Sequence, residues 1–160
     1  METVVQKTKV SYDEVHDLAW ELAEGLRGET YDCIVSIGRN GLFLAHQLSY
    51  YLGIRDIVNV TVQKYQQEGD GLTLWSDEVA VARSTFGKRV LIVDLVLDTG
   101  STAKKVLDTF SKLAQWKSPL FVCLYSTEKK KLLDREAFFV MREIGEDAWI
   151  EFPWEGQVDD

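Results

Sequence analysis

The sequence has few cysteines and prolines, and none of them lies in a pattern that would dominate the fold. Its two cysteines, Cys33 and Cys123, lie inside apolar stretches without a CxxC pair or a Cys/His spacing. This disfavours a cysteine-based metal site, and we expect both thiols to be reduced and buried. Only two prolines, Pro119 and Pro153, occur in 160 residues, and no stretch has the composition of a linker. We therefore expect one domain, residues 1–160.

Long apolar runs and basic clusters are also missing. No window reaches the roughly 18 apolar residues of a membrane span, and residues 1–7 lack the apolar core of a signal peptide. The net charge is -8, and no Lys/Arg cluster is long enough to make a basic face. We therefore expect a cytoplasmic protein with no nucleic-acid or membrane partner. Such an acidic protein would have to bind an anion locally, through backbone amides, one or two arginines or a metal ion.

The stretch Val90–Thr102 joins an apolar run to acids, glycine and hydroxyl residues. Residues 90–93 are all aliphatic, which suits a strand buried on both faces of a parallel sheet. Asp94 marks the end of that strand, and the loop 98–102 leads into a helix expected over 103–115. The amides of this loop would lie at a helix N-terminus, where they favour an anion.

Strand and helix patterns alternate along most of the chain. A capping box, Ser11 to Glu14, begins a helix that stops near Gly28, and a second helix follows Gly41 and ends at Gly53. Further strands are expected over 31–37, 57–65, 120–125 and 138–141, with a strand or hairpin arm over 72–82 and a mobile loop over 66–71. This alternation predicts an α/β fold with a doubly wound sheet.

Two loops, Gly38–Gly41 and 98–102, each follow a buried strand and precede a helix. In a doubly wound sheet they face the same edge, so one pocket can use both. Neither loop is a P-loop or a dinucleotide fingerprint, because GxxxxGK[ST] and GxGxxG are absent. A receiver-like phosphoacceptor role for Asp94 stays possible, but it leaves the Thr-Gly-Ser-Thr run unexplained. A haloacid dehalogenase is disfavoured, because Val96 stands where that family needs its second aspartate.

Val90–Thr102 resembles the phosphoribosyl-pyrophosphate (PRPP) binding motif of type I phosphoribosyltransferases. Three further segments fall in the order of that family. Residues 36–41 resemble its pyrophosphate loop, residues 63–65 and the loop beyond resemble its flexible lid, and residues 147–155 resemble the C-terminal segment of xanthine-guanine phosphoribosyltransferases. The resemblance implies a mostly parallel sheet with a small C-terminal hood.

The resemblance to the xanthine-guanine segment implies a function in purine salvage. It implies an enzyme that transfers ribose 5-phosphate from PRPP to xanthine, guanine or hypoxanthine and releases pyrophosphate, with Mg²⁺ as cofactor. Two alternatives stay open: a non-catalytic regulator that binds PRPP or a nucleotide, and a phosphoribosyltransferase for another base.

The resemblance also implies a set of PRPP-binding residues: Arg39, Asn40, Gly41, Asp94, Thr99, Gly100, Ser101 and Thr102. Thr99–Thr102 would hold the 5'-phosphate, and Asp94 would hold the ribose hydroxyls and magnesium. Arg39 would stabilise the leaving pyrophosphate and so act catalytically.

The purine side of the implied site involves three residues. Asp98 would handle the proton at purine N7, as general base or by hydrogen bonding. Trp149 would stack on the base, and the backbone at Trp149 and Ile150 would recognise the group at position 2. Residues 65–71 would close over the site.

Three positions depart from the family pattern. Leu95 replaces the second acid of the motif, so metal and ribose binding depend on Asp94 alone. Asn40 stands where the pyrophosphate loop usually has glycine. Residues 126–128 stand where 6-oxopurine enzymes carry a lysine that reads O6, and Lys129 would serve only if the turn carries an insertion.

Aromatic residues exceed what one small surface needs. Trp20, Tyr50, Tyr51 and Trp75 are expected to be exposed, which favours a homodimer or homotetramer.

Overall fold

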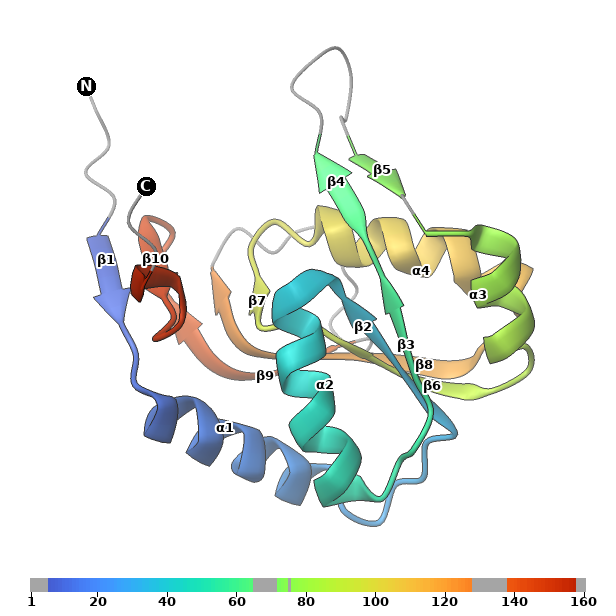
Figure 1. The fold of residues 1–160 in the computed structure, drawn as a ribbon, viewed down its shortest axis with the longest axis horizontal. Coiled ribbons are helices and arrows are strands. Elements are labelled where there is room, and N and C mark those ends of the chain that lie inside the picture. The colour runs from blue at the N-terminus through green and yellow to red at the C-terminus, as the bar shows by residue number, and fades with distance from the viewer. Residues whose placement is uncertain (1–5, 65–71, 75, 128–137, 158–160) are drawn as a thin grey trace.

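A six-stranded parallel sheet forms the centre of the computed structural model, which describes residues 6–64, 72–74, 76–127 and 138–157 (Figure 1). The strands are β2 (Cys33–Ile37), β3 (Ile57–Val60), β6 (Arg89–Val93), β7 (Val96–Leu97), β8 (Lys117–Thr127) and β9 (Phe138–Ile144). They lie in the order β3-β2-β6-β8-β7, with β9 also paired to β8. Every pairing in this sheet is parallel, so the strands end at a common edge.

Helices cover both faces of this sheet. Helices α1 (Tyr12–Gly25) and α2 (Gly38–Leu52) pack on one face, and α3 (Glu78–Thr85) and α4 (Ser101–Leu113) pack on the other. Neighbouring strand residues point to opposite sides: Leu91 belongs to the core under α1 and α2, and Ile92 belongs to the core under α3 and α4. This arrangement confirms the predicted doubly wound α/β fold.

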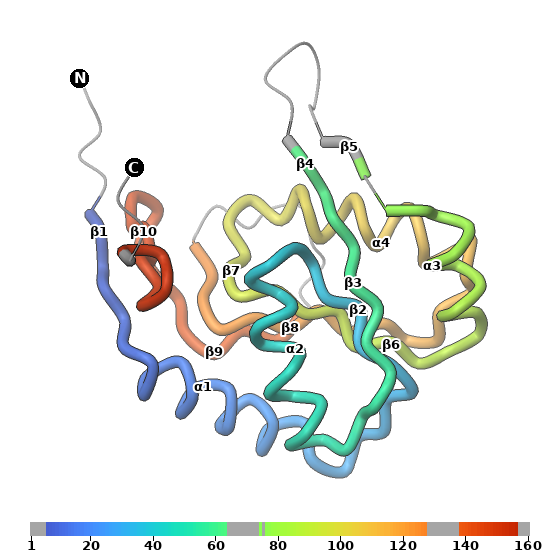
Figure 2. Tube along the Cα trace, viewed as in Figure 1, coloured from blue at the N-terminus to red at the C-terminus, as the bar shows by residue number. Residues whose placement is uncertain are grey.

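Two small sheets lie outside the central one. Strand β1 (Gln6–Lys9) pairs in parallel with β10 (Ala148–Glu151), and the short 3-10 helix η2 (Glu155–Gln157) follows (Figure 2). These elements form the expected hood, which includes an N-terminal strand that the sequence did not predict. Strand β4 (Val62–Lys64) pairs antiparallel with β5 (Leu72–Leu74).

The start of α1 and the end of α2 agree with the sequence patterns, whereas α1 ends at Gly25 before the expected Gly28, and residues 38–41, expected as a loop, form the first turn of α2. The Ser11 hydroxyl accepts a hydrogen bond from the Glu14 amide over 3.1 Å at the start of α1. Gly53 ends α2 in the left-handed conformation, at φ 68°. Cys33 and Cys123 are free and fully buried, as expected.

The single strand expected over 57–65 is wrong, because it is split at Thr61. The Thr61 amide donates to the Ser76 hydroxyl over 2.9 Å instead of to a neighbouring strand. This bond separates β3, in the central sheet, from β4 in the small one.

The strand or hairpin arm expected over 72–82 is also wrong beyond β5. Asp77 begins α3, because its carboxylate accepts hydrogen bonds from the amides of Val79 and Ala80 at 3.0 and 3.1 Å. An N-terminal cap therefore begins a helix where a strand was expected.

Several predictions concern residues outside the described ranges: the loop 66–71, the lid beyond Lys64, Trp75 and Lys129. Among the described residues, no helix is long and apolar enough to cross a membrane.

Candidate active site

Residues 38–41, now the first turn of α2, and the end of β6 lie side by side at the carboxyl edge of the sheet. A Cβ atom on Gly41 would lie 2.5 Å from the Val93 carbonyl oxygen and 3.5 Å from the Asp94 Cα atom. The start of α2 therefore approaches the end of β6 more closely than any side chain allows. Gly38 opens α2 in a left-handed conformation, at φ 61°.

The loop 98–102 forms a tight turn at the N-terminus of α4. Gly100 precedes the helix at φ 87°, a conformation that favours glycine. The Thr99 hydroxyl accepts from the Ser101 amide at 3.3 Å and donates to the Ser101 hydroxyl at 3.0 Å. This turn lines a cavity of about 230 Å³, called here the Thr99 cavity, into which the first amides of α4 present partial positive charge.

Two further cavities adjoin the Thr99 cavity. The Arg39 cavity, of about 710 Å³, is lined by Arg39, Asn40, Asp94, Thr102, Trp154, Glu155 and neighbours. The Trp149 cavity, of about 520 Å³, is lined by Asn40, Asp98, Thr127, Trp149, Ile150, Glu155 and neighbours.

Shared side chains join these three cavities into one site. Asp94 and Thr102 line both the Thr99 and Arg39 cavities. Asn40 lines both the Arg39 and Trp149 cavities, and Asp98 lines both the Trp149 and Thr99 cavities. The structure therefore brings the described residues of the implied site together at one edge of the sheet, with Gly41 packed against the end of β6 beside them, while the lid lies outside the described ranges.

Asp94 is the half-buried carboxyl of this site. Burial raises its pKa from 3.8 to about 7, although the hydrogen bond that it accepts from the Leu95 amide, at 2.7 Å, lowers the pKa. The Leu95 side chain is fully buried in the core under α1 and α2 and lines none of the three cavities.

A magnesium ion fits this donor set only if other ligands complete its shell. The described residues contain no cluster of three or more His, Cys, Asp or Glu side chains that could hold a metal. Magnesium in proteins is commonly held by one or two carboxylates, with waters and substrate phosphates as the remaining ligands. A single carboxylate, Asp94, beside a phosphate-sized cavity matches that arrangement.

Asp98 is held by a residue that the sequence did not identify as functional. The hydroxyl of Thr127, buried at the end of β8, donates to a carboxylate oxygen of Asp98 over 2.8 Å. The sequence drew attention to residues 126–128 only because 6-oxopurine enzymes carry a lysine after this strand. The two residues lie on separate strand-loop units, so no local pattern could have revealed the contact.

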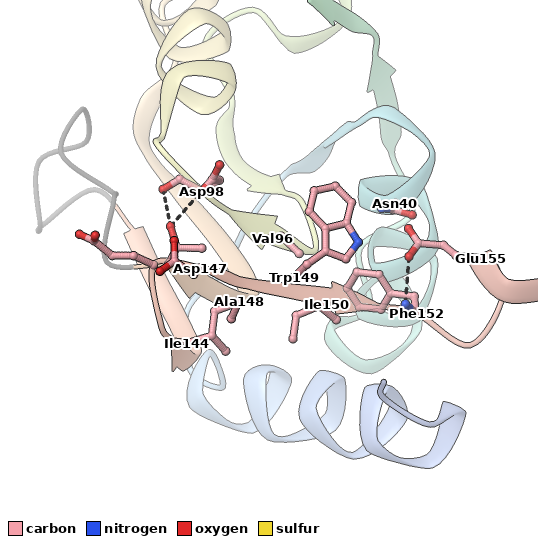
Figure 3. Close-up of a pocket in the computed structure, with 12 residues that line it drawn as sticks. Asn40, Val96, Asp98, Ile144, Asp147, Ala148, Trp149, Ile150, Phe152 and Glu155 are labelled. Atoms are coloured by element: carbon pink, nitrogen blue, oxygen red, sulfur yellow. Dashed lines mark hydrogen bonds between the residues drawn. The ribbon is translucent and has the colours of Figure 1, made fainter. Parts of the chain in front are cut away.

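The Trp149 indole stands over β10 in the Trp149 cavity, with Asp98 on one side and Asn40 and Glu155 on the other (Figure 3). Trp149 is 58% exposed, whereas Ile150 is buried beneath the strand. Among the described residues that line this cavity, none is a lysine or arginine. The described lining of the Trp149 cavity therefore offers an aromatic face and carboxylates, without a cation to read a base.

The chain matches the family described as phosphoribosyl transferase domain over residues 3–160. A relative from Idiomarina loihiensis, named xanthine-guanine phosphoribosyltransferase, is 32% identical over 91% of this chain and 85% of its own.

Two solved structures share the fold and more than a quarter of the residues. A Neisseria gonorrhoeae protein solved with bound ppGpp has a TM-score of 0.83 and 27% identity, covering 96% of this chain and 92% of its own. A purine phosphoribosyltransferase from Pyrococcus horikoshii has a TM-score of 0.76 and 29% identity, covering 96% of this chain and 97% of its own. The family match and these similarities over nearly the whole chain show that the protein belongs to the phosphoribosyltransferase family, as its motif at residues 90–102 predicted.

Proposed function

We propose that this phosphoribosyltransferase transfers the 5-phosphoribosyl group of PRPP to a 6-oxopurine, namely xanthine, guanine or hypoxanthine. The observation that carries the proposal is the union of the three cavities through Asp98, Asp94 and Asn40. A base in the Trp149 cavity lies next to the Asp98 carboxylate, while phosphates occupy the Thr99 and Arg39 cavities. The xanthine-guanine relative supports this choice of base.

The 5'-phosphate belongs in the Thr99 cavity under this proposal. The amides of the first turn of α4 and the hydroxyls of Thr99, Ser101 and Thr102 supply donors there. Gly100 lets the backbone approach the phosphate closely.

The ribose and pyrophosphate lie between Asp94 and Arg39. Asp94 accepts hydrogen bonds from the ribose hydroxyls, and Arg39 binds the pyrophosphate oxygens at the start of α2. Magnesium, when bound, would be held by Asp94 and would neutralise negative charge on the substrate. In the reaction, the bond from ribose C1 to the purine nitrogen forms as the bond from C1 to pyrophosphate breaks, and Arg39 stabilises the charge that develops on the leaving group.

Asp98 manages the purine proton. The base loses the proton at N7 as it becomes a nucleotide, and the Asp98 carboxylate accepts that proton or a hydrogen bond from it. Thr127 fixes the carboxylate for this role.

A Trp149→Ala substitution tests where the base binds. We expect KM for the base to rise about tenfold through lost stacking, with KM for PRPP unchanged. Phe86→Ala is the matched control, because Phe86 is 57% exposed and lines none of the three cavities. Equal effects of the two substitutions, or no effect of Trp149→Ala, would place the base elsewhere.

We also propose that ppGpp competes with PRPP at this site. The Neisseria gonorrhoeae protein with bound ppGpp supports this, because its fold matches over nearly the whole of this chain. A guanine base with pyrophosphate groups presents the same chemistry as the two substrates together. We expect ppGpp to raise KM for PRPP without lowering kcat; a fall in kcat alone would exclude competition at this site.

We further propose that the protein is a homodimer or homotetramer. Trp20 is 43% exposed and Tyr50 is 78% exposed, but Tyr51, also expected to be exposed, is half-buried against the core, where its ring meets the Trp20 ring edge to face with centroids 4.9 Å apart. Light scattering after size exclusion tests this: we expect at least twice the mass of one chain, and a monomer would contradict the proposal.

A further inference from the structure

Two residues, Asn40 and Glu155, line both the Arg39 cavity and the Trp149 cavity. They therefore stand at the junction between the implied pyrophosphate and base sites. The Glu155 carboxylate accepts a hydrogen bond from the Phe152 amide over 3.0 Å, and a carboxylate group can only accept hydrogen bonds. Asn40 is thus the only one of the two that can donate a side-chain hydrogen bond into the junction.

The Asn40 amide is held by the indole of Trp154. The Trp154 Nε1 atom donates to Asn40 Oδ1 at 3.4 Å. The backbone of Asn40 is not left-handed, since the described non-glycine residues with positive φ are Gln115 and Ser118. Asparagine is therefore present at this position, where the family usually has glycine, without any need for an unusual backbone conformation.

Trp154 itself is fixed by aromatic packing from separate parts of the chain. Its ring stacks on the Phe152 ring, with centroids 5.0 Å apart and an interplanar angle of 5°. The centroid of the Phe43 ring, on α2, lies 4.2 Å away. Tyr12 of α1 lies 6.0 Å away. The hood therefore presents the Trp154 N–H at a defined position next to the pyrophosphate loop.

The bond to Oδ1 also determines which way the amide faces. With Oδ1 turned to Trp154, the Nδ2 group carries two N–H donors, and no described residue accepts a hydrogen bond from it. These two N–H groups lie beside Arg39, at the boundary of a cavity where an anion is expected, and can donate hydrogen bonds to an anionic oxygen.

We propose that Asn40 Nδ2 donates a hydrogen bond to a pyrophosphate oxygen of PRPP, and that Trp154 is the positioning residue that aims it. This inference rests on the proposed function, because it takes PRPP as the substrate. It adds a side-chain contact to the backbone amides of the loop and connects the hood to pyrophosphate binding.

Calorimetry with PRPP and with inorganic pyrophosphate, each with magnesium, tests the proposal without turnover. We expect Asn40→Ala to raise the Kd of both ligands about tenfold, the effect of losing one hydrogen bond to a charged group. Trp154→Phe keeps the ring packing but lacks the N–H, and we expect it to weaken both ligands about threefold. Trp116→Phe is the matched control, since the Trp116 N–H donates to Thr85 over 2.8 Å on the other face of the sheet.

The double variant of Asn40→Ala and Trp154→Phe shows whether Trp154 acts through Asn40. We expect it to bind PRPP no more weakly than Asn40→Ala alone, and steady-state KM for the base to stay within about twofold of wild type in all variants. Multiplicative losses in the double variant, or unchanged binding in Asn40→Ala, would overturn the inference.

Two further results separate the possible failures. If Trp154→Phe does not fold, Asn40→Ser alters no aromatic contact and decides the role of Asn40, with unchanged pyrophosphate binding counting against the proposal. If wild-type protein binds neither PRPP nor pyrophosphate, the proposed function itself fails. If the wild type binds both and the Asn40 variants bind equally well, only the present inference fails.

Discussion

The hydroxyl of Thr127 donates a hydrogen bond to one carboxylate oxygen of Asp98 over 2.8 Å. Thr127 is buried at the end of β8, whereas Asp98 is exposed on the loop before α4. The rigid strand therefore orients a carboxylate that belongs to a loop, and the second carboxylate oxygen stays available to a base in the Trp149 cavity.

Replacing Thr127 with valine tests this orientation. We expect Thr127→Val to lower kcat about tenfold, because Asp98 loses the hydroxyl that orients it while the side-chain volume is nearly unchanged. Thr127→Ser keeps the hydroxyl and should keep most of the activity. Steady-state kinetics with saturating PRPP distinguish the two; equal rates for valine and serine would show that the bond has no catalytic importance.

Gly41→Ala tests the close approach of α2 to β6. The added Cβ atom would lie 2.5 Å from the Val93 carbonyl oxygen, so the helix start must shift. We expect a loss of about 2 kcal/mol in the free energy of unfolding, together with weaker PRPP binding. Gly145→Ala is the control, because its Cβ would have no neighbour within 4 Å. Urea denaturation of both variants gives the comparison, and similar stabilities would contradict the steric argument.

The raised pKa of Asp94 predicts a pH-dependent stability. Its pKa is about 7 in the folded protein and 3.8 ordinarily, so between these values the folded state binds more protons than the unfolded state. The free energy of unfolding therefore falls as pH rises from about 4 to about 7 and then stays level. Asp94→Asn, which can still accept the Leu95 amide, should remove this contribution.

Urea denaturation of the metal-free protein at pH 5 and pH 8 measures the effect. From pH 5 to pH 8, we expect the free energy of unfolding of Asp94→Asn to rise by about 2 kcal/mol relative to that of the wild type. This figure is reduced for the partial exposure of the carboxyl. Parallel pH profiles for the two proteins would mean that Asp94 titrates normally.

Leu95 should not tolerate the acid that the family motif carries at this position. Its side chain is fully buried in the core under α1 and α2, so Leu95→Asp places a carboxyl there without a partner. We expect a loss of about 3 kcal/mol or more in the free energy of unfolding. Leu95→Met, of similar volume, should cost less than about 1.5 kcal/mol. An aspartate variant as stable as wild type would show that position 95 can turn toward the site.

Local patterns were sufficient to predict the phosphate loop and the central sheet except β7. A buried strand, a glycine-containing loop and a helix are contiguous at residues 90–113, so the sequence shows all the parts of an anion site in order. Helix α3 was missed because it has only eight residues and its one N-terminal signal is the capping residue Asp77.

Contacts between distant segments could not be predicted in the same way. The pairing of β1 with β10 joins the two ends of the described chain, and the bonds from Thr127 to Asp98 and from Trp154 to Asn40 each join different elements. Such contacts depend on how the sheet and hood are assembled. The sequence placed Asn40 and Trp154 in separate motifs, and only the fold brings them together.

The most direct test of the proposed function is a spectrophotometric assay with PRPP, Mg²⁺ and each of xanthine, guanine and hypoxanthine. We expect the wild-type protein to form the nucleoside monophosphate and pyrophosphate from at least one of these bases, and Asp98→Asn to reduce kcat about 100-fold or more. No nucleotide from any of the three bases, with PRPP binding still detected by calorimetry, would contradict the proposal and leave a nucleotide-binding regulator or an enzyme for another base.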